Sequence, residues 1–185
     1  EIAAVDFMVV LGLSFFYHDS AAALVQDGVV VAAAAEERFS RIKHDSGFPS
    51  RAIDFCLRRA GISIHDVDQI VFYEKPFVKF ERLLLTAFAT FPRSHRIFQE
   101  SMRRWITDKL WVKPLIRDQL KVDPRKILFC DHHMSHAAAS FYCSPYEEAA
   151  IITVDGAGEW TTGTTGVGRG NRIELEQESR FPHSL

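Results

Sequence analysis

Hydrophobic and polar positions along the chain predict two groups of β-strands. Three apolar runs open the chain, at residues 8–14, 21–25 and 29–35. Asp27-Gly28 separates the second run from the third and is a strong signal for a tight hairpin, so these runs predict a three-stranded antiparallel meander. Three further strands are expected at residues 149–154, 160–167 and 172–177. They too are joined by glycine-containing turns, which indicates that one plan is used twice.

Helical spacing appears between these two groups. Ile53 and Leu57 lie on one face of a predicted helix, with Ser50 as its N-cap and Gly61 at its end. The next strand, at residues 69–73, is expected to pair in parallel with the meander, because strand–helix–strand units cross over with a fixed hand.

A helical insert is expected at about residues 75–120. Residues 75–117 carry ten lysines and arginines against three acidic residues. Basic residues on amphipathic helices are mostly solvated or cover an acidic neighbour, so no nucleic-acid partner is expected.

Composition fits a globular protein without a membrane segment. Hydrophobic residues make up 47% of the 185 positions and charged residues 25%, which is enough to bury a core. The net charge of -2 gives no general attraction to nucleic acids or membranes, and no apolar run reaches the length of a membrane-spanning helix. Three cysteines without paired spacing, and a start without a basic segment, predict a cytoplasmic protein with reduced thiols.

Candidate metal ligands follow two of the predicted buried strands. His132 and His136 stand four residues apart in a helix predicted after the strand at residues 126–130, so both project from one helical face. Asp155 follows a later strand, and we expect it to meet the two histidines. Two imidazoles and one carboxylate are typical of Fe(II) sites, with zinc or manganese as alternatives. A helix cap or a surface histidine pair is the competing interpretation, and His133 points away from the pair.

Two polar turns are candidate phosphate contacts. The turns at residues 18–20 and 155–158 each follow the first strand of a meander, and they would converge in a cleft between two lobes. Gly156 and Gly158 let backbone N–H groups approach phosphate oxygens closely. These turns predict a nucleotide phosphate near the metal, although plain β-turns explain them as well. The charged stretch at residues 36–45 is expected to be a loop, either solvated or facing a ligand.

Four segments resemble the N-terminal part of the O-carbamoyltransferases, biosynthetic enzymes that modify nodulation factors and antibiotics such as aminoglycosides and cephamycins. The segments lie in collinear order at residues 11–22, 36–44, 131–138 and 153–156. The resemblance implies an α/β fold, an actin-like ATPase (ribonuclease H-like) lobe related to the enzymes that form threonylcarbamoyl-adenosine in tRNA. Such a lobe has a mixed sheet with an antiparallel three-stranded meander and flanking helices, and the start of a second, similar lobe would follow.

The same resemblance implies an activity and a metal. In that family a His-x-x-x-His pair and a later aspartate hold iron, at positions that match His132, His136 and Asp155 here. The family's reaction uses carbamoyl phosphate and ATP to make carbamoyl adenylate. The carbamoyl group then passes to a hydroxyl group of a small-molecule acceptor.

Several further residues receive expected roles from this resemblance. His18 is the candidate general base for the acceptor hydroxyl, and Asp19 either orients it or is a turn residue only. Candidate contacts to the carbamoyl or phosphate groups are Arg38, Lys43 and His44, while Ser20, Gly156 and Gly158 are candidates for the nucleotide phosphate from the two polar turns described above.

The chain is expected to contain a first lobe at residues 1–145, including the insert, and the first strands of a second lobe at residues 146–185. A complete enzyme of this kind needs the rest of the second lobe and a domain that makes the adenylate. We therefore expect the C-terminal remainder of the enzyme as a partner, and this chain alone to be inactive. Two other functions stay open, a sugar- or acetate-kinase-like phosphotransferase and a non-catalytic docking module that uses the basic insert.

Overall fold

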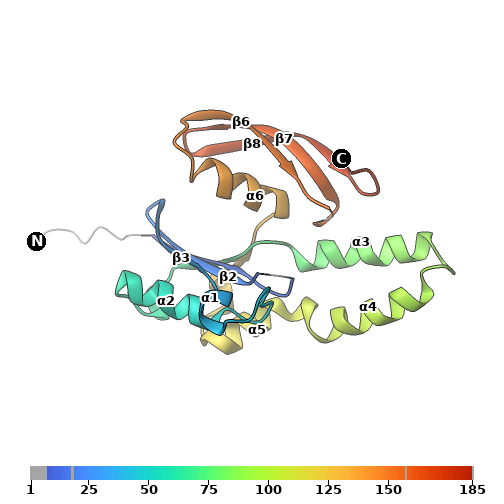
Figure 1. The fold of residues 1–185 in the computed structure, drawn as a ribbon, viewed down its shortest axis with the longest axis horizontal. Helices are drawn as coiled ribbons and strands as arrows, with labels where there is room; N and C mark the ends of the chain where they lie inside the picture. The colour runs from blue at the N-terminus through green and yellow to red at the C-terminus, as the bar shows by residue number, and fades with distance from the viewer. Residues whose placement is uncertain (1–7, 18, 157, 185) are drawn as a thin grey trace, which may run out of the picture. The chain divides into compact units, whose positions relative to one another are not determined.

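A computed structural model describes residues 8–17, 19–156 and 158–184, with side chains omitted at five positions of one helix (96, 97, 100, 101 and 104) (Figure 1). His18, the expected general base, lies outside the described residues. The chain forms two compact units. The first unit comprises Glu1–Tyr73 with Val112–Phe129, and the second comprises Glu74–Trp111 with Cys130–Leu185.

The first unit is built on a five-stranded mixed sheet. Its strands are β1 (Val9–Ser14), β2 (Ala21–Gln26), β3 (Val29–Ala35), β4 (Gln69–Phe72) and β5 (Ile127–Phe129), in the spatial order β3-β2-β1-β4-β5. β1, β2 and β3 pair antiparallel, whereas β1 with β4 and β4 with β5 pair in parallel. The predicted meander and the predicted parallel crossover are both confirmed.

Helices cover this sheet and complete its core. They are α1 (Glu37–Ser40), α2 (Ser50–Ala60) and α5 (Val112–Leu120), with 3₁₀ turns η1 (Ile64–Asp66) and η3 (Pro124–Lys126). α2 packs on β2 and β3 and buries Ala52, Ile53 and Cys56. Alternate residues of β1, Leu11 and Leu13, are buried with them, as the period of two in a strand requires. α1 is a correction, because the charged stretch was expected to be a loop throughout.

The start of α2 corrects another expectation. Pro49, and not Ser50, is the N-cap residue, and its side chain makes no capping hydrogen bond. The carboxylate of Glu36, at the end of β3, accepts hydrogen bonds from the backbone N–H groups of Arg51 (3.2 Å) and Ala52 (2.8 Å). Glu36 is 4% exposed, so a buried carboxylate from a distant element satisfies the helix start.

The second unit contains two long helices and a three-stranded sheet. Its elements are α3 (Pro76–Ala89), α4 (His95–Thr107), η2 (Lys109–Trp111), α6 (His132–Phe141), β6 (Glu148–Val154), β7 (Thr161–Arg169) and β8 (Arg172–Arg180). The strands pair antiparallel in the order β6-β7-β8, which confirms the predicted second meander. α6 packs on one face of this sheet, where Phe141 lies against Gly168 so closely that an added Cβ would be 2.7 Å from its ring (Figure 1).

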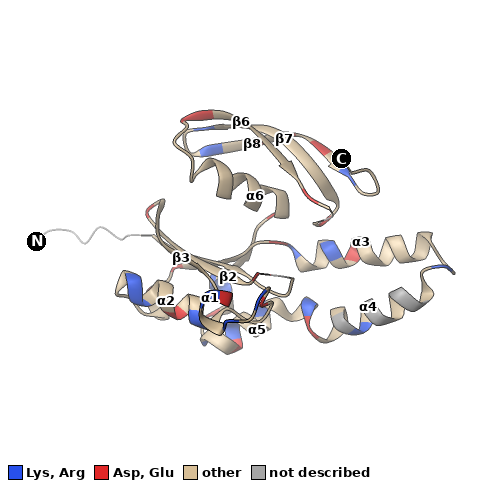
Figure 2. Ribbon diagram, viewed as in Figure 1, with Lys and Arg blue, Asp and Glu red and all other residues tan. Residues whose placement is uncertain are grey.

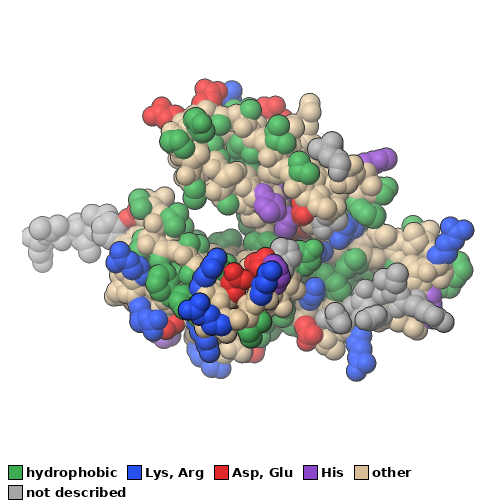
Figure 3. Space-filling view, viewed as in Figure 1, with side chains coloured by type: hydrophobic (Ala, Val, Ile, Leu, Met, Phe, Trp, Pro, Cys, Tyr) green, Lys and Arg blue, Asp and Glu red, His purple; other side chains and the backbone are tan. Residues whose placement is uncertain are grey.

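The other face of β6 is apolar and exposed. Ile152 is 72% exposed and Val154 57% exposed, while Ile151 and Thr153 between them are buried. Green side chains are visible on the surface over this sheet in Figure 3. Exposed apolar residues in a row on one strand face are unusual unless another part of the protein covers them.

The overall architecture confirms the predicted α/β class with a mixed sheet, an antiparallel meander and a second antiparallel sheet. The predicted lobe boundary at residue 145 divides the chain differently from the two compact units, and the lobes stay a prediction. Along α3 the lysine and arginine positions are interrupted by an acidic residue and by uncharged ones (Figure 2). None of the helices in the described part of the chain is both long enough and apolar enough to cross a membrane.

Replacing the buried capping carboxylate, Glu36→Ala, is expected to lower the free energy of unfolding by about 1–3 kcal/mol, because two N–H groups at the start of α2 lose a charged acceptor. Urea unfolding followed by circular dichroism measures the loss. The control is Glu37→Ala, whose carboxylate accepts one exposed hydrogen bond from the His44 backbone. An equal loss in both variants would contradict the capping role.

Candidate metal centre

One helix start and one strand end bring the three predicted metal ligands together. His132 is the first residue of α6 and His136 lies one turn later. Asp155 follows β6 directly, and its backbone N–H still donates to the Thr162 carbonyl across the hairpin (2.9 Å). The Gly156 N–H donates to Asp155 Oδ1 (2.6 Å), which orients the carboxylate.

The three side chains converge on one point. His132 Nε2 lies 2.8 Å from Asp155 Oδ2 and 3.1 Å from His136 Nε2, and one ligand atom from each residue lies within 4.8 Å of the others. Metal–nitrogen distances of about 2.0–2.1 Å in a tetrahedral site place ligand atoms roughly 3.3 Å apart. The donor set and its spacing therefore fit a divalent ion, and that such an ion binds here stays a prediction.

The environment favours unprotonated ligands. Burial lowers the pKa of His132, with a further contribution from His136, while Asp155 and Glu74 partly oppose the shift. Burial alone would raise the pKa of Asp155, but the Gly156 N–H and the His132 imidazole hold it below its usual value. Neutral imidazole and ionised carboxylate are the forms that bind metals.

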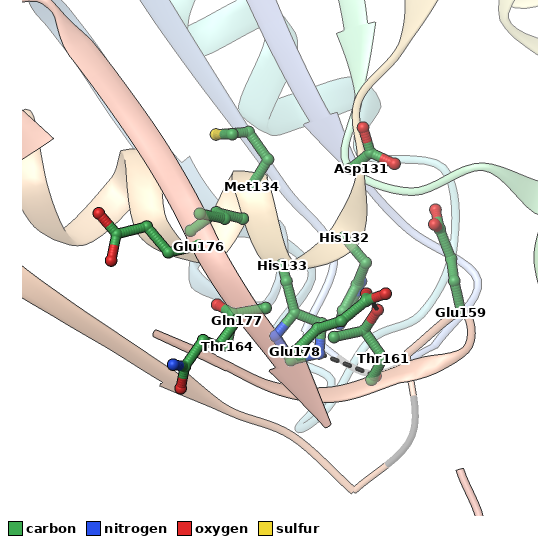
Figure 4. A pocket seen from close by; sticks show the side chains of 11 residues that line it. Asp131, His132, His133, Met134, Glu159, Thr161, Thr164, Glu176, Gln177 and Glu178 are labelled. Carbon is green, nitrogen blue, oxygen red and sulfur yellow. Dashed lines mark hydrogen bonds between the residues drawn. The ribbon is translucent and has the colours of Figure 1, made fainter. Parts of the chain in front are cut away.

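The His133 side chain is held by hydrogen bonds to the neighbouring sheet. Its Nδ1 is 2.6 Å from the Thr153 hydroxyl and its Nε2 is 2.9 Å from the Thr161 carbonyl, the contact dashed in Figure 4. Because a carbonyl only accepts, Nε2 carries the proton and Nδ1 accepts from Thr153. Thr164 lies 2.6 Å from Thr153 and extends this chain of hydrogen bonds. The buried His133 ring thus anchors α6 to β6 and β7.

A buried charged cluster beside the ligands was not predicted. Glu74 Oε2 accepts from Lys79 Nζ at 2.6 Å and lies 3.7 Å from His132 Nδ1. Arg82, 7% exposed, lies near Glu74 and Asp155, and burial lowers its pKa. One signal in the sequence could have identified Glu74 but was missed. It follows β4, and the carboxyl ends of neighbouring parallel strands such as β4 and β5 meet at one edge of a sheet.

A second charged cluster lies at a cavity next to α6. Lys75 Nζ binds Asp131 at 2.7 Å, and the Lys75 backbone N–H donates to the buried Glu159 carboxylate at 2.6 Å. Burial raises the pKa of Glu159, against the effect of that hydrogen bond. Asp131, Glu159, Glu176 and Glu178 line a cavity of about 280 Å³ together with His132 and His133 (Figure 4). This acidic lining disfavours a phosphate inside the cavity itself.

The predicted site residues of the first unit occupy a different region of the chain. Asp19 Oδ1 lies 2.9 Å from His44 Nδ1, so Asp19 contacts an imidazole. Both residues have left-handed backbones, with φ of 58° and 56°. Arg38 and Lys43 are exposed. Ser20 is fully buried and its backbone pairs with Asp45 and Glu36, so its placement gives no support to a phosphate contact through its hydroxyl.

The two glycines of the second-unit turn differ sharply. Gly156 is exposed, and no atom lies within 4 Å of an added Cβ. Gly158 is buried, and an added Cβ would lie 2.3 Å from His132 Cδ2. The absence of a Cβ at Gly158 leaves room for the His132 ring, and the expected contact of Gly158 with phosphate stays a prediction.

The substitution Gly158→Ala is expected to displace the His132 ring and to lower the free energy of unfolding by about 1–3 kcal/mol, as overpacking does. NMR signals of the His132 imidazole and urea unfolding measure both effects. Gly156→Ala is the matched control and should leave the His132 signals in place. Equal shifts in the two variants would show that the close contact with Gly158 is not what positions the ring.

Stability of the metal-free protein is expected to fall as the pH decreases below about 6.5. Since the pKa of His132 in the folded state is below its ordinary value of 6.5, the unfolded chain takes up this proton first. The unfavourable contribution of His132 to the free energy of unfolding is therefore absent above pH 6.5 and grows as the pH falls below that value. Urea unfolding at several pH values should show a smaller decrease for His132→Gln, and identical pH dependence would disprove the assignment.

Comparison with known proteins places the chain in a family. The family described as Carbamoyltransferase N-terminus matches residues 9–185. An uncharacterized protein of Synechocystis, sll1178, is 50% identical over 95% of this chain and 30% of its own length. Nodulation protein NolNO of Sinorhizobium fredii is 37% identical over 91% of this chain and 24% of its own length. The chain thus spans about a quarter to a third of the length of these relatives.

The structure of YeaZ from Pseudomonas aeruginosa has a TM-score of 0.44 and 14% identity, and the match covers 95% of this chain and 67% of that one. A likeness at this level supports no statement about function. The sequence matches are far stronger, and they cover both meanders and the histidine-bearing helix. The chain belongs to the carbamoyltransferase family, as a member of its N-terminal domain family.

Proposed function

We propose that this chain is the N-terminal part of an O-carbamoyltransferase. In the proposed reaction, carbamoyl phosphate, water and ATP give carbamoyl adenylate with release of phosphate and pyrophosphate. The carbamoyl group then passes from the adenylate to a hydroxyl group of a sugar or antibiotic-like acceptor, and AMP leaves. Family membership supports carbamoyl transfer in general. The observation that carries the finer proposal is the convergence of His132, His136 and Asp155, which suits a metal-assisted reaction of a phosphate ester.

The proposed metal is Fe(II), with zinc or manganese as alternatives, held by His132 Nε2, His136 Nε2 and Asp155 Oδ2. When bound, the ion supplies a Lewis acid that attracts phosphate oxygens and stabilises charge on a leaving AMP. The chain's own contribution is to keep the ligands unprotonated and aligned. Burial of His132 and the Gly156 N–H bond to Asp155 serve this purpose.

The proposed transfer step is an acyl substitution. The acceptor oxygen attacks the carbamoyl carbon, the bond from that carbon to the adenylate oxygen breaks, and AMP leaves with the electron pair. The hydroxyl proton passes to a base, for which His18 is the proposed residue on the basis of the family resemblance. Arg38, Lys43 and His44 are proposed to contact the carbamoyl or phosphate groups, and Asp19 would orient His44.

The rest of the enzyme is the proposed partner of this chain. The relatives are three to four times longer than the part that this chain matches. The exposed apolar residues Ile152 and Val154 support a further segment that packs on β6. Turnover by the present chain alone is not expected, because the adenylate-forming domain and the rest of the second lobe would be missing.

The deciding experiment compares full-length wild-type protein with His136→Ala, purified without oxygen. We expect about one equivalent of metal and ATP-dependent release of AMP with an acceptor in the wild type. The variant should lose the metal and more than about 100-fold of the activity, since even residues behind the ligands contribute about 10- to 100-fold. His65→Ala, an exposed histidine of the first unit, is the control.

Absence of metal from the wild type, or full activity of His136→Ala, would contradict the proposal. Phosphate transfer to an acceptor that survives the substitution would instead indicate a kinase-like phosphotransferase. A stable complex formed through residues 75–117, with neither metal nor turnover, would indicate a docking module.

A further inference from the structure

Both ring nitrogens of His132 lie near other side chains. Nε2 points toward Asp155 and His136, as described above. Nδ1 lies 3.7 Å from Oε2 of Glu74, and the side chains of His132 and Glu74 are only 10% and 9% exposed. We propose that Glu74 is a positioning residue, which holds the His132 ring with Nε2 free for the candidate metal. This inference rests on the proposed function only for the presence of that metal.

The chemistry of imidazole explains why a carboxylate is useful there. A neutral imidazole carries one proton, and an ionised Asp155 at 2.8 Å draws it to Nε2, because a carboxylate only accepts. A metal ion at Nε2 requires the proton on Nδ1 instead. In a buried site an Nδ1–H group without an acceptor is costly. Glu74 supplies the acceptor for that tautomer, in the manner of the carboxylates behind many metal-bound histidines.

The separation of 3.7 Å is longer than a hydrogen bond. Movement of about 1 Å by either side chain would bring the pair within hydrogen-bonding distance, which is about 2.7–3.2 Å for N–H to O. We therefore expect the distance from His132 Nδ1 to Glu74 Oε2 to be shorter in the metal-loaded protein.

Neighbouring cations hold the Glu74 side chain in place. Lys79 Nζ lies 2.6 Å from the same Oε2, and its side chain is 13% exposed. Arg82, on the same helix, is also buried and interacts electrostatically with Glu74. Buried acidic side chains are usually paired with cations, and Lys79 and Arg82 of α3 provide that pairing for Glu74. The cluster thereby links the start of α3 to the start of α6.

The test measures binding of Co²⁺ to the full-length protein by titration of its visible absorption. Glu74→Gln keeps the size and removes the charge, and we expect the dissociation constant for Co²⁺ to rise about 10- to 100-fold. The absorption spectrum of the saturated variant should match the wild type, since the ligands are unchanged. Glu81→Gln, at an exposed position of the same helix, is the matched control and should bind as wild type does.

A second variant guards against misfolding. Glu74→Gln removes one charge of the buried ion pair with Lys79, and breaking such a pair on one side is strongly destabilising. The double variant Glu74→Gln with Lys79→Met removes both charges at similar volume. It is expected to fold, as judged by circular dichroism, and to show the same rise in the dissociation constant.

Three outcomes of the Co²⁺ titration would contradict the proposal. Binding within twofold of wild type in the folded variants would overturn the positioning role alone. A changed spectrum at saturation would identify Glu74 as a ligand and would also overturn it. Failure of the wild type itself to bind Co²⁺ would overturn the proposed metal centre, and this inference with it.

Discussion

Three atoms that carry lone pairs, His132 Nε2, His136 Nε2 and Asp155 Oδ2, lie so close together that they need a shared proton or a cation between them. The rest of the second unit is arranged around this requirement. α6 presents both histidines on one face, and the β6–β7 hairpin delivers the aspartate. Gly158 leaves room for the imidazole, and His133 ties the helix to the sheet. The proton between His132 Nε2 and Asp155 Oδ2 would have to leave before an ion could bind at these atoms.

Buried charges concentrate around the same helix start. Glu74, Arg82 and Glu159 are among the most buried charged residues in the described part of the chain. Burying ions rarely adds to stability, because desolvation offsets most of the attraction between partners. A fold selected only for stability would favour apolar residues at these positions. Their presence next to three candidate ligands is the pattern expected of a functional site.

Each unit contains a three-stranded antiparallel meander, but the surroundings of the meander differ between the units. In the first unit, β1 continues into a parallel pair with β4, and α2 completes a closed apolar core. In the second unit β6 has one sheet neighbour, and its outer face exposes Ile152 and Val154. The core of that unit is correspondingly small, with Ala137, Phe141 and Ile151 at its centre. Much of its order therefore depends on the polar network around α6.

The sequence by itself determined the strands, the two meanders and the parallel crossover, and it predicted that His132, His136 and Asp155 come together as a candidate ligand set. These follow from local periodicity, hairpin signals and helical spacing, which act over a few residues. Only the tertiary structure decided that Glu36 caps α2, that Glu74 faces His132, that Ser20 is buried and that Gly158 serves the imidazole. Each of these depends on a contact between segments far apart in the chain. Tertiary packing sets such contacts, and it leaves no periodic pattern in the sequence from which they could be predicted.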